Sequence, residues 1–395
     1  MSYEHIEIEP QTFDIDAAEV ERRRERVRRA WRYEAVDHIP VTIDFSPACG
    51  ETVYGTHNDI AAWFASAVRR IRWSLRLLDD DYIPLAEPPW LGFHPVASML
   101  GARLWWSDDP NEMPGIKDPL VKDVRQLYDL PDPDRRSDGV GPELLRRLAL
   151  AKECFPVEVA LGGVDMTSPL GDVLDIMDQT LFFMSLKRDP DAILHACGVV
   201  TRAQTALQDA ALAVVGERER LAGFTNWPTW RPEFAPVLVA DDIAGLFSPA
   251  VFERFDQPFT NQLFERYGGG LLHICGPNPS AGLYMHDAPR IHGHNCSFRY
   301  SRGDFARLRE ELGLKAQERL GRRGHLEIMF ERGVPLAAMV EGFREMAAAF
   351  APDVLALPYC QIVPDGSVGD DDIRAFCAVM REIAQEYAAA MRWDA

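Results

Sequence analysis

The sequence predicts an α/β fold, a (β/α)8 barrel (TIM barrel), and three observations support this expectation. The chain has 395 residues, which suits one large barrel or two average domains. Its composition, 47% hydrophobic and 26% charged, is enough to build a sizeable core. Short apolar runs alternate with stretches of helical period, in about eight units, and this alternation favours parallel strands joined by helices.

The expected strands follow the apolar runs. Each run is short, rich in Val, Ile, Leu or Phe, and bounded by glycine, proline or charged residues, as buried parallel strands are. In chain order they span residues 38–45, 155–163, 220–227, 236–242, 270–276, 290–296, 325–330 and 353–360. Because parallel strands need a crossover connection, we expect a helix between most successive strands.

Helical periodicity fills the intervals between these runs. Three of the predicted helices span residues 248–268, 301–313 and 334–350. The first begins at Ser-Pro and ends at glycine, which are common start and stop signals. The arginine-rich stretch 21–32 is typical of a solvated helix face. We therefore divide the chain into an N-terminal helical extension, residues 1–35, and a barrel, residues 36–395.

A loop-like stretch and an alternative architecture also have to be considered. Residues 129–143 are rich in Pro and Asp and are expected to form a loop or an excursion from the barrel. A doubly wound open sheet is the alternative architecture. It calls for a glycine-rich phosphate loop after the first strand, and residues 44–51, DFSPACGE, do not provide one.

Charge and hydropathy argue against several functions. The formal net charge of −19 disfavours nucleic-acid binding, which depends on basic groups. No segment has the roughly 18 uncharged apolar residues of a membrane span, and residues 1–24 lack the apolar region of a signal peptide. The seven cysteines are scattered and odd in number, so we expect reduced thiols and a cytoplasmic protein. A homodimer is expected only because such dimers are common.

The apolar run 270–276 ends in a pair of metal-ligand types. His273 and Cys275 are two positions apart and therefore share one face of a strand. Cys360 also ends an apolar run. In a barrel such strand ends meet at the catalytic mouth, where one nitrogen and two sulfur ligands would leave the fourth position of a zinc tetrahedron open. The alternative is that both cysteines are small core residues.

A second cluster and several acids compete for a catalytic role. The run 290–296 places His292, His294 and Cys296 at alternate positions, so they share one strand face. They could form a second metal site or face the substrate, and we assign His294 to catalysis. The acidic candidates are Asp241, Asp242 and Glu327, which end or interrupt apolar runs. An acid in an apolar strand needs a partner if it is buried, so an ion pair with an arginine is the alternative to catalysis.

The substrate is expected to meet aromatic and amide side chains. Residues 224–234, FTNWPTWRPEF, place two tryptophans and an arginine beside the predicted mouth, where an aromatic wall could stack on a flat corrin or pterin ring or simply pack the loop. The residues assigned to substrate binding are Asn226, Trp227, Trp230 and Asn295.

Three stretches resemble the uroporphyrinogen decarboxylase superfamily. They are residues 22–44, residues 170–197 and residues 239–276, the last combining an Asp-rich strand end, a Ser-Pro helix start and a strand that ends in His-x-Cys-Gly. The resemblance extends roughly over residues 21–387. It implies a (β/α)8 barrel, in agreement with the pattern of strands and helices.

The resemblance is closest to the zinc-dependent methyltransferase branch. Residues 39–55 contain no arginine, whereas porphyrinogen decarboxylases carry an arginine-rich loop there. His273, Cys275 and Cys360 match the His-x-Cys and distant Cys that bind zinc in the methyltransferases. This implies transfer of a methyl group between a corrinoid and a small-molecule thiol or tetrahydrofolate. The corrinoid would come from a partner protein, since no Asp-x-His-x-x-Gly signature is present.

The sequence is also compatible with two other functions. One is a metal-free decarboxylase of a small aromatic or heterocyclic acid, in which an acid or histidine transfers the proton. The other is a non-catalytic binding module, although the many ionisable residues at strand ends count against it.

Overall fold

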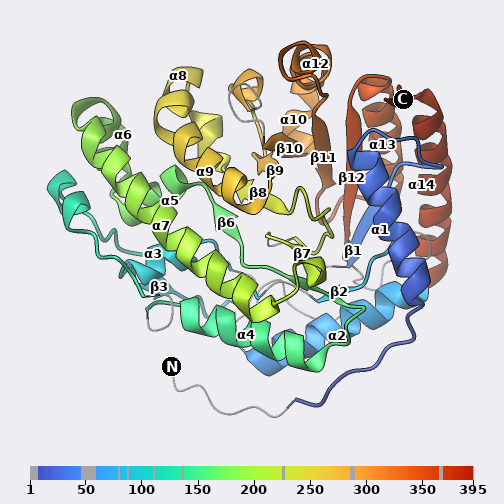
Figure 1. Cartoon of the computed structure of the whole chain (residues 1–395), viewed down its shortest axis with the longest axis horizontal. Coiled ribbons are helices and arrows are strands. Elements are labelled where there is room, and N and C mark those ends of the chain that lie inside the picture. The colour runs from blue at the N-terminus through green and yellow to red at the C-terminus, as the bar shows by residue number, and fades with distance from the viewer. Residues whose placement is uncertain are drawn as a thin grey trace.

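A curled parallel sheet forms the centre of the molecule (Figure 1). The computed structural model describes residues 8–45, 59–78, 81–86, 89–109, 112–134, 138–224, 227–284, 290–363 and 368–394. Seven strands pair in the order β1-β12-β11-β10-β9-β8-β6, all in parallel. They are β1 (Thr42–Phe45), β6 (Met166–Thr167), β8 (Val237–Ala240), β9 (Gly270–His273), β10 (Ile291–Ser297), β11 (His325–Phe330) and β12 (Leu355–Ile362).

Five short strands complete the sheet structure. β2 (Leu85–Ala86), β5 (Ala160–Gly162) and β7 (Leu221–Gly223) form a parallel three-stranded sheet, and a parallel bridge from Phe224 to Val237 connects its end to β8. β3 (Leu104–Trp105) and β4 (Gly115–Ile116) form a small antiparallel pair.

The sheet is open, and this corrects the expectation of a closed eight-stranded ring. Among the described residues, β1 pairs with β12 on one side and has no ladder to β2 on the other. The strands on the open side have only two or three residues, so they offer too few backbone groups to continue the hydrogen bonding of the long strands.

Helices surround the sheet. They are α1 (Ala17–Trp31), α2 (Ile60–Leu77), α3 (Pro95–Met99), α4 (Gly141–Cys154), α5 (Pro169–Ile176), α6 (Gln179–Arg188), α7 (Pro190–Val215), α8 (Pro249–Val251), α9 (Gln257–Tyr267), α10 (Phe298–Ser301), α11 (Phe305–Leu312), α12 (Leu314–Leu320), α13 (Leu336–Phe350) and α14 (Asp370–Ala390). Several begin at a side-chain cap; for example, Asp16 and Asp59 accept backbone N–H groups at the starts of α1 and α2. None of the helices in the described ranges is both long and apolar enough to cross a membrane.

The expected strands are confirmed. All eight apolar runs contain a strand, whereas β2, β3, β4 and β6 were not expected. Strands β9, β11 and β12 are buried along their whole length because helices cover the outer face of the sheet and side chains fill the inner face. This burial on both faces explains why their sequences are continuous apolar runs.

The N-terminal helix packs closely on the rest of the chain. The Trp31 ring stacks on His325 of β11 with ring centroids 4.9 Å apart. Arg28 forms an ion pair with Glu233 in the segment after β7. The Tyr33 hydroxyl donates to the Gly324 carbonyl at 2.5 Å. Helix α1 and the sheet therefore share one hydrophobic core.

Candidate metal centre

The carboxyl end of strand β9 presents two of the predicted ligands. The strand ends at His273, which is buried, and Cys275 follows at a partly exposed position. Gly276 then turns the chain with φ of +127°, and a Cβ there would lie 2.8 Å from the Ser301 hydroxyl oxygen. Only glycine fits this turn without strain, so the chain leaves the sheet directly after Cys275.

The neighbouring strand β8 contributes a third group. Ala240 at the end of β8 pairs with His273, and the Asp241 N–H donates to the His273 carbonyl at 2.8 Å. Asp242 comes next, at the start of the 3-10 helix η3 (Asp242–Leu246), with its side chain 60% exposed. Its Oδ1 accepts the Cys275 N–H at 2.7 Å, which fixes the carboxylate beside the thiol.

These three side chains converge on one point. The His273 Nε2 atom lies 3.3 Å from Cys275 Sγ and 3.6 Å from Asp242 Oδ1. Within the described ranges this is the one group of three His, Cys, Asp or Glu donors lying within 4.8 Å of one another. Tetrahedral zinc, with bonds of about 2.0–2.3 Å, has ligand-to-ligand distances of about 3.4–3.6 Å. The group is therefore compatible with zinc, and three donors leave a fourth position for substrate.

The thiol is held in its neutral form by its surroundings. Burial raises the pKa of Cys275, and the nearby Asp242 carboxylate raises it further. The Cys275 thiolate and the Asp242 carboxylate would both carry negative charge when they bind a metal. Among the described contacts, no lysine or arginine is paired with either side chain. A divalent cation would supply the missing positive charge and favour the thiolate.

A ladder of hydrogen bonds supports His273 from behind. In the strand register, His273 of β9 lies opposite Asn295 of β10, which lies opposite Glu327 of β11. Asn295 Oδ1 is 2.5 Å from His273 Nδ1, and Asn295 Nδ2 donates to Glu327 Oε1. Arg231, from the segment after β7, donates to the same oxygen at 2.6 Å. All four side chains are buried.

This ladder determines which nitrogen of His273 carries the proton. Arginine can only donate and an ionised carboxylate can only accept, so Glu327 must receive the amide hydrogens of Asn295. The amide carbonyl then faces His273 and requires Nδ1–H as its donor. The lone pair of Nε2 is left pointing at Cys275 and Asp242, as a metal ligand requires.

The expected partner of His273 was an acid, and the structure corrects this. We expected Asp241, Asp242 or Glu327 to accept from the imidazole, but the acceptor is Asn295, and Glu327 acts one step further away. Asn295 was expected to bind substrate; its side chain is fully buried and both of its polar atoms are used in the ladder. For Glu327, the ion pair with an arginine was the alternative interpretation, and the pair with Arg231 is present.

Cys360 does not join the group. It lies within β12, which continues to Ile362, and it pairs with Ile43 of β1. The register places Leu357 beside Glu327, and residues three apart on a strand face opposite sides, so Cys360 faces away from the ladder. Its thiol is fully buried near Cys377 of α14, and burial raises its pKa. The third donor of the group is Asp242 instead.

The second cluster of the sequence also lies elsewhere. His294 and Cys296 alternate with Asn295 and therefore occupy the outer face of β10. The His294 ring packs on Tyr284, and its Nδ1 bonds to the Leu272 carbonyl. Burial lowers the pKa of His294 to about 3. His292 packs near Trp31 and His325. The His294 ring therefore lies in the helix-facing layer, which removes the reason to assign His294 to catalysis.

Asp241 and Asp242 have opposite environments. Asp242 is exposed at the metal group, whereas Asp241 is buried beside Asp256 of the π-helical segment before α9. Burial raises the pKa of Asp241 well above its usual range, and the Asp256 carboxyl raises it further. Asp241 is therefore a neutral acid inside the protein, and Asp242 is the acid that can meet a ligand.

The two tryptophans of the segment 224–234 lie in different parts of the structure. The Trp227 ring lies 4.6 Å from the His273 ring, tilted by 60°, so it forms a wall of the group. Trp230 packs against α1, where the guanidinium groups of Arg24 and Arg28 lie over its ring. Asn226 lies outside the described residues.

Comparison with known proteins finds similarity in structure. No family model matches the sequence, and no curated protein matches it. Among solved structures, the chain is similar to a methyltransferase from Methanosarcina mazei, with a TM-score of 0.62 and 17% sequence identity. The alignment covers 91% of this chain and 98% of that one. At this identity the likeness shows a shared fold over nearly the whole chain.

Proposed function

We propose that the protein is a zinc-dependent methyltransferase with a modified (β/α)8-barrel fold. The observation that carries the proposal is the Asp242, His273 and Cys275 group at the carboxyl ends of two adjacent parallel strands, where barrel enzymes place their chemistry. The structural likeness to a methyltransferase supports the same class of reaction.

Zinc would be held by His273 Nε2, Cys275 Sγ and a carboxylate oxygen of Asp242. When bound, it supplies the positive charge that lowers the pKa of a thiol acceptor at neutral pH. The chain's own residues prepare this site. Asn295, Glu327 and Arg231 hold the proton on Nδ1 and keep Nε2 available, and Trp227 walls one side of the imidazole.

The methyl donor and acceptor are proposed from the resemblance to the corrinoid-dependent methyltransferase branch. We propose a methyl-corrinoid carried by a partner protein as donor, and a small-molecule thiol as acceptor. Tetrahydrofolate is the other acceptor of this class. The Asp242 side chain is 60% exposed, which supports access to the group from solvent.

Zinc stoichiometry tests the proposal. Purified parent protein should contain about one zinc per chain by elemental analysis. His273→Gln, Cys275→Ser and Asp242→Asn should each lower the zinc content and the methyl-transfer rate together, because each removes a donor. Cys360→Ser is the matched control for the cysteine change and should keep its zinc, since Cys360 faces the helix layer.

The outcome also decides between the candidate functions. If the parent binds no zinc when zinc is supplied, the metal-free decarboxylase replaces the methyltransferase as the proposal. If Cys360→Ser loses zinc and Asp242→Asn keeps it, the ligand set is His273, Cys275 and Cys360, and the sheet must rearrange on binding.

A further inference from the structure

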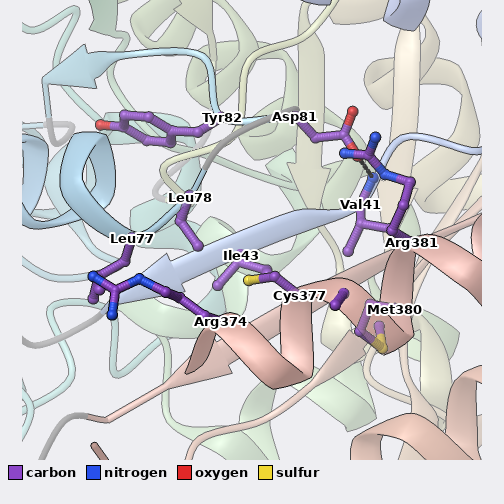
Figure 2. A pocket seen from close by; sticks show the side chains of 11 residues that line it. Val41, Ile43, Leu77, Leu78, Asp81, Tyr82, Arg374, Cys377, Met380 and Arg381 are labelled. Carbon is purple, nitrogen blue, oxygen red and sulfur yellow. Dashed lines mark hydrogen bonds and ion pairs between the residues drawn. The ribbon is translucent and has the colours of Figure 1, made fainter. Parts of the chain in front are cut away.

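A cavity of about 230 Å³ lies on the outer side of strand β1 (Figure 2). It is lined by β1 with Val41 before it, by the end of α2 with Leu78, Asp81 and Tyr82, and by α14. Its apolar wall comes from Val41, Ile43, Leu77, Leu78 and Met380. A cavity of about 150 Å³ holds a benzene molecule, so this space has room for a larger apolar group.

This cavity is separate from the candidate metal centre. β1 is at one edge of the seven-stranded sheet, and β8, which carries Asp242 at its end, lies near the other edge. Ile43 pairs with Cys360, and both side chains face the helix layer, whereas the metal group is supported from the inner face. A ligand here would not touch His273 or Cys275.

Two arginines of α14 line the cavity. Arg374 and Arg381 are seven residues apart, which places them on one face of the helix about 10 Å apart along its axis. Figure 2 shows their guanidinium groups at opposite ends of the space. The lining also includes one carboxylate, that of Asp81.

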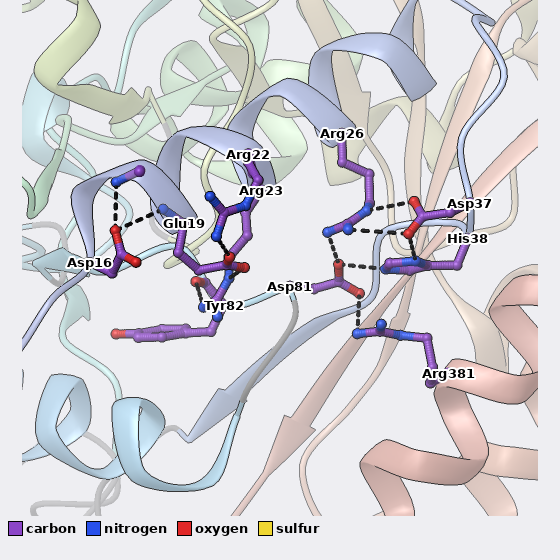
Figure 3. Close-up of polar contacts among 11 residues, drawn as sticks. Asp16, Glu19, Arg22, Arg23, Arg26, Asp37, His38, Asp81, Tyr82 and Arg381 are labelled. Carbon is purple, nitrogen blue, oxygen red and sulfur yellow. Dashed lines mark hydrogen bonds and ion pairs between the residues drawn. The ribbon is translucent and has the colours of Figure 1, made fainter.

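Asp81 is engaged by the protein itself (Figure 3). Its Oδ1 is 2.9 Å from His38 Nε2 and accepts from Arg26 at 3.3 Å, and its Oδ2 accepts the Val41 N–H at 3.1 Å. Arg381 approaches the same carboxylate at 3.8 Å. One end of the cavity is therefore already neutralised by protein groups.

The other end is different. Arg374 pairs with Asp371, one turn earlier on α14, at 3.0 Å, with the two side chains 50% and 102% exposed. An exposed pair of this kind contributes only about 0.2–1 kcal/mol, because water and salt compete with it. A carboxylate that also has an apolar body in the cavity can therefore replace Asp371 as the partner of Arg374, with two parallel hydrogen bonds.

We propose that this cavity is a binding site for a small amphipathic carboxylate. The apolar body of the ligand lies against Val41, Leu78 and Met380, and its carboxylate pairs with Arg374. The site is independent of the proposed methyl transfer, and it uses a surface that the catalytic group does not reach.

Octanoate is the probe, with octanol as its uncharged counterpart, and isothermal titration calorimetry is the measurement. The parent should bind octanoate and bind octanol at least tenfold more weakly. Ala378, an exposed residue that lines the cavity, can accept a larger side chain without loss of core packing. Ala378→Phe should abolish octanoate binding, whereas Ala375→Phe, exposed on the same helix outside the cavity, should not.

The charge is tested separately. Arg374→Gln should weaken octanoate binding about tenfold and leave octanol binding unchanged. Arg344→Gln, at an exposed position of α13, is its control. Thermal unfolding midpoints equal to that of the parent show that each variant is folded. The proposal is overturned if the parent does not bind octanoate, if Ala378→Phe binds it as well as the parent does, or if octanol binds equally tightly.

Discussion

Loss of the Glu327 charge should destabilise the folded protein strongly. Glu327 and Arg231 form an ion pair at 2.6 Å, with side chains only 7% and 1% exposed. In a Glu327→Gln variant the amide oxygen can still accept from Asn295, so the shape of the ladder is kept. The positive charge of Arg231 then has no counter-charge in a buried position.

The size of the effect follows from that burial. Breaking a buried pair by removing one charge costs about 3–5 kcal/mol. Arg231 Nε and Nη1 have no hydrogen-bond partner in the described structure, so no other contact offsets the loss. Since a domain is stable by only about 5–15 kcal/mol, the change should be plain in urea unfolding at pH 7. Zinc affinity should also fall about 10–100-fold, because the partner of His273 is less firmly oriented.

A double-mutant cycle provides the control. Arg231→Met alone should also cost about 3–5 kcal/mol, because it leaves the Glu327 charge buried. Arg231→Met combined with Glu327→Gln removes both charges and should cost much less than the sum of the two single changes. If the two costs simply add, or if Glu327→Gln costs less than about 1 kcal/mol, then the pair is not the buried ion pair that we describe.

Three further predictions concern packing, pH and the excluded cysteine. In Gly270→Ala the new Cβ would lie 1.7 Å from the Val237 carbonyl oxygen, so β8 and β9 must separate and the free energy of unfolding should fall by about 3 kcal/mol or more. Gly303→Ala is the control, because a Cβ at Gly303 would have no atom within 4 Å. Equal stability of the two variants would contradict the packing of β8 against β9. Burial lowers the pKa of His325 to about 4, whereas a histidine in the unfolded chain has a pKa near 6.5. The contribution of neutral His325 to the free energy of unfolding is therefore fully present above pH 6.5. It should be lost by about 1.4 kcal/mol per pH unit as the pH falls from 6.5 to 4, and a His325→Gln variant followed by urea unfolding should lack this contribution. Cys360→Ala should retain bound zinc but unfold at lower urea concentration, because it leaves a small void between β12 and α14; loss of zinc from a folded variant would return Cys360 to the ligand set.

Local pattern was enough to locate the strands and two residues of the candidate metal centre. The eight apolar runs each contain a strand because burial on both faces of a parallel sheet demands continuous apolar sequence. His273 and Cys275 were predicted together because alternate residues of an extended segment share a face, and they do lie together although β9 itself ends at His273. Gly276 marked the turn by which the chain leaves this edge of the sheet, although the strand itself ends earlier, at His273.

The same pattern failed for Cys360 because burial on both faces hides the direction of a side chain. β12 is buried at all of its positions, so its sequence does not indicate which alternate residues face the inner side. The strand also extends two residues past Cys360, so Cys360 is not at the strand end and its backbone pairs with Ile43 of β1. Only the register with β11 shows that Cys360 faces the helices.

The ladder behind His273 depends wholly on tertiary structure. Asn295 and Glu327 lie 22 and 32 residues beyond their respective partners, and Arg231 comes from the opposite direction along the chain. The sequence by itself determined that strands with polar ends would occur and that His273 and Cys275 would lie together. Which side chains meet them was decided by strand register, and register depends on how distant segments pack, because one residue of slip would turn every one of these side chains to the other face.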